Sequence, residues 1–160
     1  MIVAQVIKPK DPIQDPEYRT SVFLAGSIEM GKSEDWQVRI ENELSDLNVT
    51  IFNPRRDDWD SSWEEESTNR EFNYQVNWEM NRLSESTIIF MYFSPETKSP
   101  ISLLEFGLHA NDGNMIVCCP DGFWRKGNVE IVCDRYGIPL HNDLESAIAA
   151  LKSKVYSCVY

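Results

Sequence analysis

The chain has 160 residues, 42% hydrophobic and 26% charged, a composition typical of a globular domain that buries a sizeable core. Its formal net charge of −11 argues against duplex nucleic acid or an anionic membrane surface as the main partner, although a small phosphorylated ligand is not excluded. No stretch is apolar for long enough to form a signal peptide or a membrane span, so we expect one cytoplasmic domain over residues 1–160.

The first third of the chain predicts strands that alternate with one helix. Residues 1–19 combine a short alternating segment with several prolines, which indicates an edge strand followed by an irregular arm. Residues 21–25 form the first core strand and residues 49–52 the next. Between them we expect a helix that begins after an N-cap at Ser33. Its apolar residues recur at helical spacing: Trp36, Ile40, Leu44 and Leu47.

A long polar segment, residues 55–69, follows the second core strand and shows no periodic pattern. Loops of this length are uncommon in a compact domain unless they are functional or mobile. Two interpretations stay open. The segment is either a solvated charged loop, or its Trp59 and Trp63 cover a base or a sugar.

The next helix, residues 70–84, carries a carboxylate on its apolar face. The residues expected to define that face are Phe72, Val76, Met80 and Leu83. Glu79 falls within it, and an unpaired carboxylate there costs several kcal/mol. We therefore expect Glu79 to line a polar pocket or to meet a cation; the alternative is that it reaches solvent or pairs with Arg70 or Arg82.

The most apolar run, residues 87–93, predicts a central strand, and a helix that begins near Ile101 follows it. Glu105 lies about one turn into this helix, at the edge of the sheet where ligands bind in open α/β folds. The positive end of the helix dipole at this edge favours anions, and we expect it to keep Glu105 ionised, as a nucleophile requires.

The remaining sequence completes an α/β pattern with two more strands and two more helices. They are expected at residues 113–120 (strand), 128–137 (helix), 138–140 (strand) and 142–151 (helix, with Asn142 or Asp143 as its cap). The predicted fold is a single-domain, doubly wound sheet of the flavodoxin or Rossmann type. It has about five mostly parallel strands, with helices on both faces.

The four cysteines give no sign of a metal site, because none forms a CxxC pair and no histidine lies near them at a zinc-ligand spacing. We expect the adjacent Cys118 and Cys119 to pack as small hydrophobic side chains. His109 and His141 each stand alone and are expected to be structural. The sequence therefore predicts neither a metal nor another cofactor.

Two carboxylates in one pocket are the groups that glycosidic bond cleavage uses, one as nucleophile and one to handle a proton or a sugar hydroxyl. If Glu79 enters the pocket of Glu105, the sequence supports this chemistry. The chain contains no P-loop, no GxGxxG after a strand, no GxSxG and no HExxH, so nucleoside triphosphate, dinucleotide, esterase and metalloprotease functions lack support.

Several segments, in order and at these spacings, resemble the nucleoside 2-deoxyribosyltransferase superfamily, which includes the 2'-deoxynucleoside 5'-monophosphate N-glycosidases. The resemblance extends from Ser21 to about Leu151. The segments are FLAGSI (23–28), FNPRRDDW (52–59), YQVNWE (74–79), SPISLLEFG (99–107) and PDGFWRKGNVEIVC (120–133).

The resemblance implies a role for each matching residue. Glu105 corresponds to the nucleophilic glutamate that forms a deoxyribosyl ester, and Glu79 to an aspartate that touches the sugar hydroxyls or the nucleophile. Ser99 corresponds to a phosphate-contacting serine of the hydrolases, where the transferases carry an aspartate. Asn128 corresponds to a residue that completes the pocket of a neighbouring subunit, which implies a homodimer or larger homo-oligomer. The implied substrate-binding residues are Gly26, Ser27, Ile28, Asn53, Arg55, Trp59, Ser99, Ser102 and Asn128.

From the carboxylates and the resemblance together, we expect cleavage of the N-glycosidic bond of 2'-deoxynucleosides or their 5'-monophosphates. The sugar would pass to another base, as in a transferase, or to water, as in a hydrolase. Two alternatives stay open at this point: a nucleotide-binding or sensing domain without turnover, and a glycohydrolase of the NAD type.

Overall fold

The computed structural model of the protein describes residues 3–12, 20–28 and 35–160. In these ranges six strands form one sheet in the order β1-β3-β2-β4-β5-β6, and every neighbouring pair is parallel. The strands are β1 (Gln5–Ile7), β2 (Thr20–Gly26), β3 (Val49–Phe52), β4 (Ile88–Tyr92), β5 (Met115–Cys118) and β6 (Leu140–His141). The predicted α/β fold is confirmed, with six strands rather than about five and with all of them parallel.

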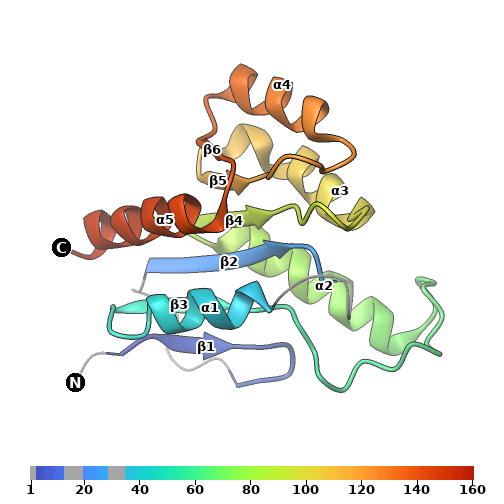
Figure 1. The fold of residues 1–160 in the computed structure, drawn as a ribbon. Coiled ribbons are helices and arrows are strands. Elements are labelled where there is room, and N and C mark those ends of the chain that lie inside the picture. The colour runs from blue at the N-terminus through green and yellow to red at the C-terminus, as the bar shows by residue number, and fades with distance from the viewer. Residues whose placement is uncertain (1–2, 13–19, 29–34) are drawn as a thin grey trace.

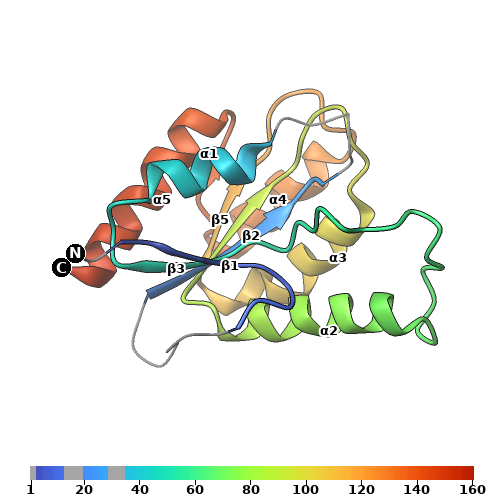
Figure 2. The same cartoon turned by 90° about the horizontal axis from the view of Figure 1, so that it is seen from below.

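Helices cover both faces of this sheet, as the alternation of elements predicted (Figures 1 and 2). One face packs against α1 (Trp36–Glu43) and α5 (Leu144–Val159). The other packs against α2 (Arg70–Glu85), α3 (Pro100–His109) and α4 (Lys126–Tyr136), with a 3₁₀ turn at Ala110–Asp112 between α3 and β5. None of the helices in the described ranges is long and apolar enough to cross a membrane.

Strand β4 lies between β2 and β5 near the middle of the sheet, and all five of its residues are buried. Apolar helices on both faces explain this, because a strand covered on both sides reads as a continuous hydrophobic run. Cys118, the last residue of the neighbouring strand β5, and Cys119 after it are buried in the core as predicted, and Cys133 of α4 is buried too.

Two of the predicted helix-end signals are confirmed, although α4 begins at Lys126, before the predicted residue 128, and α5 extends to Val159, beyond the predicted residue 151. Asp143 caps α5 by accepting a hydrogen bond from the Ser146 N–H (2.7 Å), and Gly137 ends α4 in the left-handed conformation. Asp35 caps α1 through the Val38 N–H. The predicted cap Ser33 lies outside the described residues.

The buried face of α2 differs from the prediction. Trp78 is buried and its ring packs against Phe23 and Phe52, with centroid separations of 6.2 and 6.3 Å, whereas Met80 is 51% exposed. The large indole fills the space above the sheet, and this rotates the helix so that Gln75, Trp78 and Leu83 face inward. Glu79 is therefore half-buried beside this face rather than at the centre of the predicted one.

Candidate active site

The candidate site lies at the carboxyl edge of β2 and β4. From β2 the chain goes to β3 on one side of the sheet, while β4 leads to β5 and β6 on the other. The strand order therefore reverses between β2 and β4, and the crevice at such a reversal is where open α/β sheets bind ligands. The predicted residues Gly26, Ser27 and Ser99 all lie at this edge.

Gly26 brings the two strand ends into close contact. Its φ is 137°, and a Cβ atom added here would lie 2.2 Å from the Tyr92 carbonyl oxygen of β4. Only glycine fits, because both the backbone angle and the contact exclude a side chain. The Ser27 N–H then donates to the same Tyr92 oxygen at 3.0 Å, so the predicted loop begins against β4.

Three buried hydroxyl groups meet at this point. Ser27 Oγ lies 2.7 Å from Ser99 Oγ and 2.9 Å from Thr97 Oγ1. Ser99 Oγ and Thr97 Oγ1 are 2.7 Å apart. The Ser94 N–H also donates to Ser27 Oγ at 2.9 Å. We call Ser27, Thr97 and Ser99 the hydroxyl cluster. Its hydroxyls can rotate to donate to an anion, which suits a phosphate-binding position.

The backbone of Ser99 is unusual for a residue other than glycine. Its φ is 46° and its ψ is 54°, in the left-handed region, and it precedes α3 without capping that helix through its side chain. Backbone angles of this kind cost free energy and concentrate at functional sites. The Ser99 hydroxyl is directed to the hydroxyl cluster instead.

Trp36 holds the cluster from the other side of the sheet. Its indole Nε1–H donates to the Ser27 carbonyl oxygen at 2.9 Å, and the ring packs between Phe90 and Tyr92. The side chain is fully buried. A residue that the sequence marks as helix core therefore also fixes the loop after β2, while Ile28 in the same loop is exposed.

The two predicted catalytic carboxylates interact across α2 and α3. Burial raises the pKa of Glu79 to about 7, and a hydrogen bond from Gln75 Nε2 to Glu79 Oε1 (2.9 Å) acts in the opposite direction. Burial raises the pKa of Glu105 to about 8, with a further contribution from the charge of Glu79. Arg82, one of the two partners in the alternative interpretation of Glu79, pairs with Glu85 at 3.0 Å instead.

The expectation that the start of α3 keeps Glu105 ionised is wrong. Glu105 lies in the second turn of the helix, where the dipole no longer dominates, and its carboxyl is withdrawn from water beside a like charge. At neutral pH the pair therefore retains a proton. Two coupled carboxyls that share a proton can supply both an acid and a base.

The loop after β3 carries two predicted ligand residues that make structural contacts. Asn53 is buried; its Nδ2 donates to Glu41 Oε1 at 2.6 Å, and its Oδ1 accepts from the Arg55 N–H at 3.0 Å. Arg55 lies 3.4 Å from Asp35 at the start of α1. These contacts direct Asn53 and Arg55 toward α1 at the edge of the sheet.

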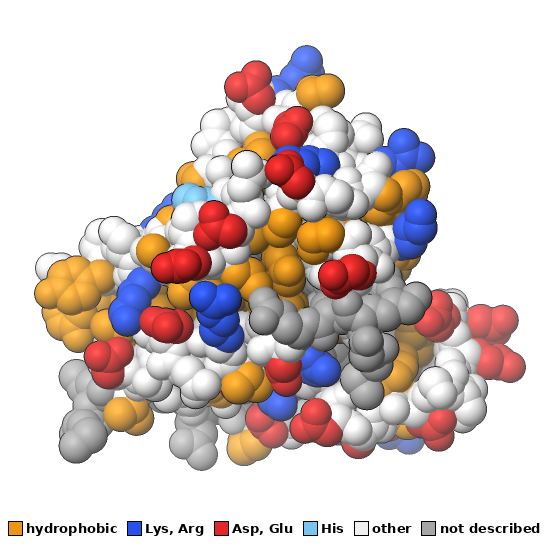
Figure 3. Space-filling model, viewed as in Figure 1, with side chains coloured by type: hydrophobic (Ala, Val, Ile, Leu, Met, Phe, Trp, Pro, Cys, Tyr) orange, Lys and Arg blue, Asp and Glu red, His pale blue; other side chains and the backbone are white. Residues whose placement is uncertain are grey.

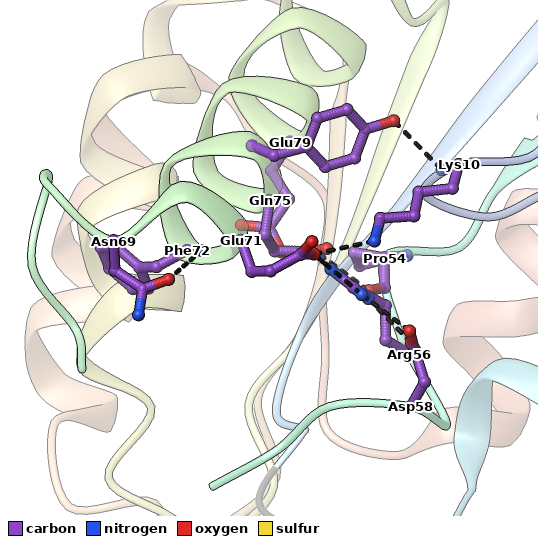
Figure 4. Close-up of polar contacts among 10 residues, drawn as sticks. Lys10, Pro54, Arg56, Asp58, Asn69, Glu71, Phe72, Gln75 and Glu79 are labelled. Atoms are coloured by element: carbon purple, nitrogen blue, oxygen red, sulfur yellow. Dashed lines mark hydrogen bonds and ion pairs between the residues drawn. The ribbon is translucent and has the colours of Figure 1, made fainter. Parts of the chain in front are cut away.

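Further along this loop, an ion-pair cluster surrounds Arg56, whose side chain is only 3% exposed (Figure 4). Arg56 donates to both carboxylate oxygens of Asp58 (2.9 and 2.8 Å) and to Glu71 of α2 (3.3 Å), and Lys10 pairs with Glu71 at 2.8 Å. We call Lys10, Arg56, Asp58 and Glu71 the arginine cluster. No sequence pattern indicates this cluster, because its members come from three separate segments.

The tryptophans of the loop pack on the arginine cluster. Trp59 and Trp63 meet edge to face at 5.0 Å, and the Arg56 guanidinium lies 5.7 and 5.3 Å from their ring centroids. Trp59 remains 37% exposed. The loop thus has a defined core of its own, which the interpretation as a solvated charged loop did not anticipate.

Two other predicted residues lie on α3 and α4. Ser102 is buried one turn before Glu105 on α3. Asn128 is exposed in the first turn of α4. No contact joins Asn128 to the carboxylates in the described part of the molecule, so its predicted role depends on a second subunit.

A cavity of about 580 Å³ adjoins the candidate site on the α1 and α5 side. Ser94 links the two, and other lining residues are Arg39, Tyr92 and Asp143. Figure 3 shows apolar side chains near the centre of this face with acidic and basic ones around them. Glu79 and Glu105 do not line this cavity.

The described residues contain no group of three or more His, Cys, Asp or Glu that could hold a metal ion. His109 Nδ1 lies 2.7 Å from Asp112 Oδ2 at the end of α3, a local contact. Burial raises the pKa of Cys118 and Cys133 to about 12 and that of Cys119 to about 11, so these thiols stay protonated and are poor nucleophiles.

Comparison with known protein families places this geometry in context. Residues 19–123, about two thirds of the chain, match the model of a family described as nucleoside 2-deoxyribosyltransferase like. The match includes the hydroxyl cluster and both carboxylates, and it ends before Asn128. No curated protein matches the sequence.

Proposed function

Since the chain belongs to the nucleoside 2-deoxyribosyltransferase-like family, we propose that it cleaves the N-glycosidic bond of 2'-deoxynucleosides or their 5'-monophosphates. The single observation that carries this proposal is the pair of interacting carboxyls, Glu79 of α2 and Glu105 of α3, the second on the helix that begins directly after Ser99 of the hydroxyl cluster. Cleavage of this bond needs a nucleophile for the sugar and a proton for the leaving base, and the pair holds both.

In the first step, an ionised oxygen of Glu105 attacks C1' of the deoxyribose while the bond from C1' to the base nitrogen breaks. A deoxyribosyl ester forms on Glu105. The higher pKa of Glu105 places the shared proton mainly on Glu105 in the free pair; it passes to Glu79 before the attack, and Glu79 gives it to the departing base, so the charge balances. A sugar without a 2'-hydroxyl forms this oxocarbenium-like transition state more easily.

In the second step, water or another base attacks C1' and the ester bond breaks. This regenerates the Glu105 carboxylate, and the proton of the incoming group returns to Glu79. Attack by water makes the enzyme a hydrolase, and attack by a base makes it a transferase.

The hydroxyl cluster favours substrates with a 5'-phosphate. Ser27, Thr97 and Ser99 place three buried hydroxyls within 2.9 Å of one another. The exposed Lys98 lies between two of them in sequence and adds a positive charge in an otherwise acidic protein. A free 5'-hydroxyl needs at most two partners, whereas a phosphate can accept from all three.

A second subunit is part of the proposal. Ile101, Leu104 and Leu108 form an exposed apolar stripe on α3, 59%, 58% and 57% exposed, directly beside Glu105. Contiguous exposed apolar residues mark interaction surfaces. A homodimer that covers this stripe would bring Asn128 of the neighbouring α4 toward the pocket. Sedimentation of the wild type and of Leu104→Asp tests it: a monomeric wild type contradicts the homodimer.

The activity test incubates the protein with deoxynucleosides and with deoxynucleoside 5'-monophosphates, with and without a second base, and follows the products chromatographically. Base release without a second base indicates a hydrolase, and exchange of bases indicates a transferase. No release and no exchange with any substrate contradicts the proposed function.

The raised pKa of Glu105 favours one second candidate, a nucleotide-binding domain without turnover, since a protonated carboxyl does not attack a sugar. Calorimetric binding of a deoxynucleotide, with the ligand recovered unchanged at pH 7 and at pH 9, would support it over the enzyme.

A further inference from the structure

Gln75 joins the second carboxylate to the loop after β3. Its side chain is buried, with the residue only 7% exposed, and its Nε2 donates to two acceptors (Figure 4). One is the Pro54 carbonyl oxygen at 3.0 Å and the other is Glu79 Oε1 at 2.9 Å. Neither the family resemblance nor the periodicity of α2 assigned a role to this residue.

These two bonds settle the orientation of the amide. An amide nitrogen carries two protons, and here each has an acceptor. The reversed amide would place Gln75 Oε1 against the Pro54 carbonyl oxygen, which has no proton to give. In the observed orientation Oε1 is buried without a hydrogen-bond partner, a free-energy cost that the molecule bears to keep both donors in place.

The Pro54 carbonyl group, the first acceptor of Gln75, is held in position by its neighbours in the chain. Pro54 follows Asn53, whose N–H donates to the Ile7 carbonyl oxygen (3.0 Å) and extends the sheet. Pro54 also lies two residues before Arg56. Arg56 forms an ion pair with Glu71 on α2, the helix that carries Gln75. The Pro54 carbonyl is therefore a fixed reference point for the Gln75 side chain.

We propose that Gln75 is a positioning residue that acts through Glu79. Because it occupies Glu79 Oε1 as an acceptor, only Glu79 Oε2 is left to hold the proton that the carboxyl pair shares. The proton then has one defined position from which to reach the leaving base. The inference rests on the proposed function for this last step, although the hydrogen-bonded geometry stands without it.

Few other charges act on Glu79 among the described residues. Glu105 faces it from α3. On its own helix Glu71 is engaged by Lys10 and Arg56, and Arg82 by Glu85. In the described part of the structure, Gln75 is thus the group that stabilises the ionised form of Glu79.

The test replaces Gln75 with methionine, which is similar in length and volume but has no donor. Glutamate side chains are labelled with carbon-13, and the Glu79 carboxyl resonance, assigned through Glu79→Gln, is titrated by NMR. Loss of one hydrogen bond is expected to raise the apparent pKa of Glu79 by about 0.5 to 1. An unchanged titration overturns the proposal. Asn77→Leu, which removes an exposed amide on the same helix, is the control and should leave the titration unchanged.

A double-mutant cycle separates a positioning role from a general structural one. We expect Gln75→Met to lower kcat for base release about tenfold in the wild type and to have no further effect in the Glu79→Gln background. Full additivity of the two substitutions overturns the proposal. If Gln75→Met does not fold, Gln75→Asn serves instead, since its amide is one methylene too short to reach both acceptors.

Failure of the proposed function is distinguishable from failure of this inference. The titration needs no turnover, so it decides the role of Gln75 even if the wild type releases no base. If base is released but the titration does not change, the proposed function is supported and the proposed role of Gln75 is contradicted.

Discussion

The arginine cluster and the carboxyl pair each take one residue from α2, Glu71 and Glu79, yet charges are arranged in opposite ways in the two groups. In the arginine cluster every charge has an opposite partner, and the hydrogen bonds from Arg56 lower the pKa of Asp58 to about 2. In the carboxyl pair two like charges meet away from water, and the pKa values rise to about 7 and 8. About two helical turns separate Glu71 of the first group from Glu79 of the second.

The difference indicates what each group contributes. Paired charges that satisfy one another stabilise the fold and fix the loop that contains Trp59. Like charges forced together lower stability, and they persist where chemistry needs a shared proton. The same helix therefore contributes to a cluster of paired charges and to the carboxyl pair that we propose as catalytic, and separate substitutions test the two groups.

The largest expected effect comes from the carboxyl pair. Glu105→Gln removes the proposed nucleophile, and we expect kcat for base release to fall by about 10⁴-fold, measured by chromatography at pH 8. Glu130→Gln, an exposed change on α4, is the matched control and should keep full activity. Wild-type turnover in Glu105→Gln would exclude the ester intermediate.

The pH dependence of activity is the next largest effect. Because the reactive pair carries one proton, kcat/KM should rise as the pair loses its first proton, reach a maximum between about pH 7 and pH 8, and fall as the second proton is lost. In Glu79→Gln the like charge is gone, so the remaining activity should level off at lower pH. A flat profile between pH 5 and 8 would contradict the raised pKa of Glu105.

The arginine cluster should affect stability rather than chemistry. Arg56→Leu removes hydrogen bonds to two carboxylates and the contacts with two indoles, and we expect the free energy of unfolding at pH 7 to fall by about 2 kcal/mol. Urea denaturation measures it. Arg135→Leu, at an exposed position of α4, is the control and should change the free energy of unfolding by less than about 0.5 kcal/mol. Equal effects of the two substitutions would mean that the cluster is not structural.

The smallest expected effect is a gain in the free energy of unfolding, whereas Arg56→Leu is expected to lower it. The folded pKa of Glu79 lies above that of an unfolded glutamate, so the folded state binds more protons between these values and wild-type stability falls as pH rises from about 4.5 to above 7. Glu79→Gln avoids this loss, and since the side chain keeps some contact with water, we expect a gain of about 1–2 kcal/mol at pH 8. The gain should vanish at pH 4. Denaturation at both pH values checks it.

Much of the fold follows from local pattern. The run at residues 87–93 predicted β4, and Gly137 and Asp143 predicted helix ends, because each signal lies within a few residues. The buried face of α2 did not follow, since Trp78 and Met80 are both apolar and only the rings of Phe23 and Phe52 decide between them.

Four residues of the candidate site were named from the sequence, but their contacts were not. Glu79, Glu105, Ser27 and Ser99 were found from helical position and family resemblance. Their contacts join residues far apart in sequence, such as Ser27 and Ser99. The prediction that Glu105 is ionised was wrong for the same reason, because its pKa is set by burial and by the charge of Glu79 on another helix. Thr97 carries only the weak signal of one hydroxyl in a proline-rich loop.

Two glycines near the site differ in how much change they allow. At Gly107 in α3 an added Cβ would have no atom within 4 Å, and alanine there should be accepted without loss. At Gly26 even one methyl group would push apart the ends of β2 and β4 and carry Ser27 with it. In a library of all single substitutions, we therefore expect only glycine at position 26 among the variants that fold. At Gly107, two residues from the proposed nucleophile, we expect many different residues.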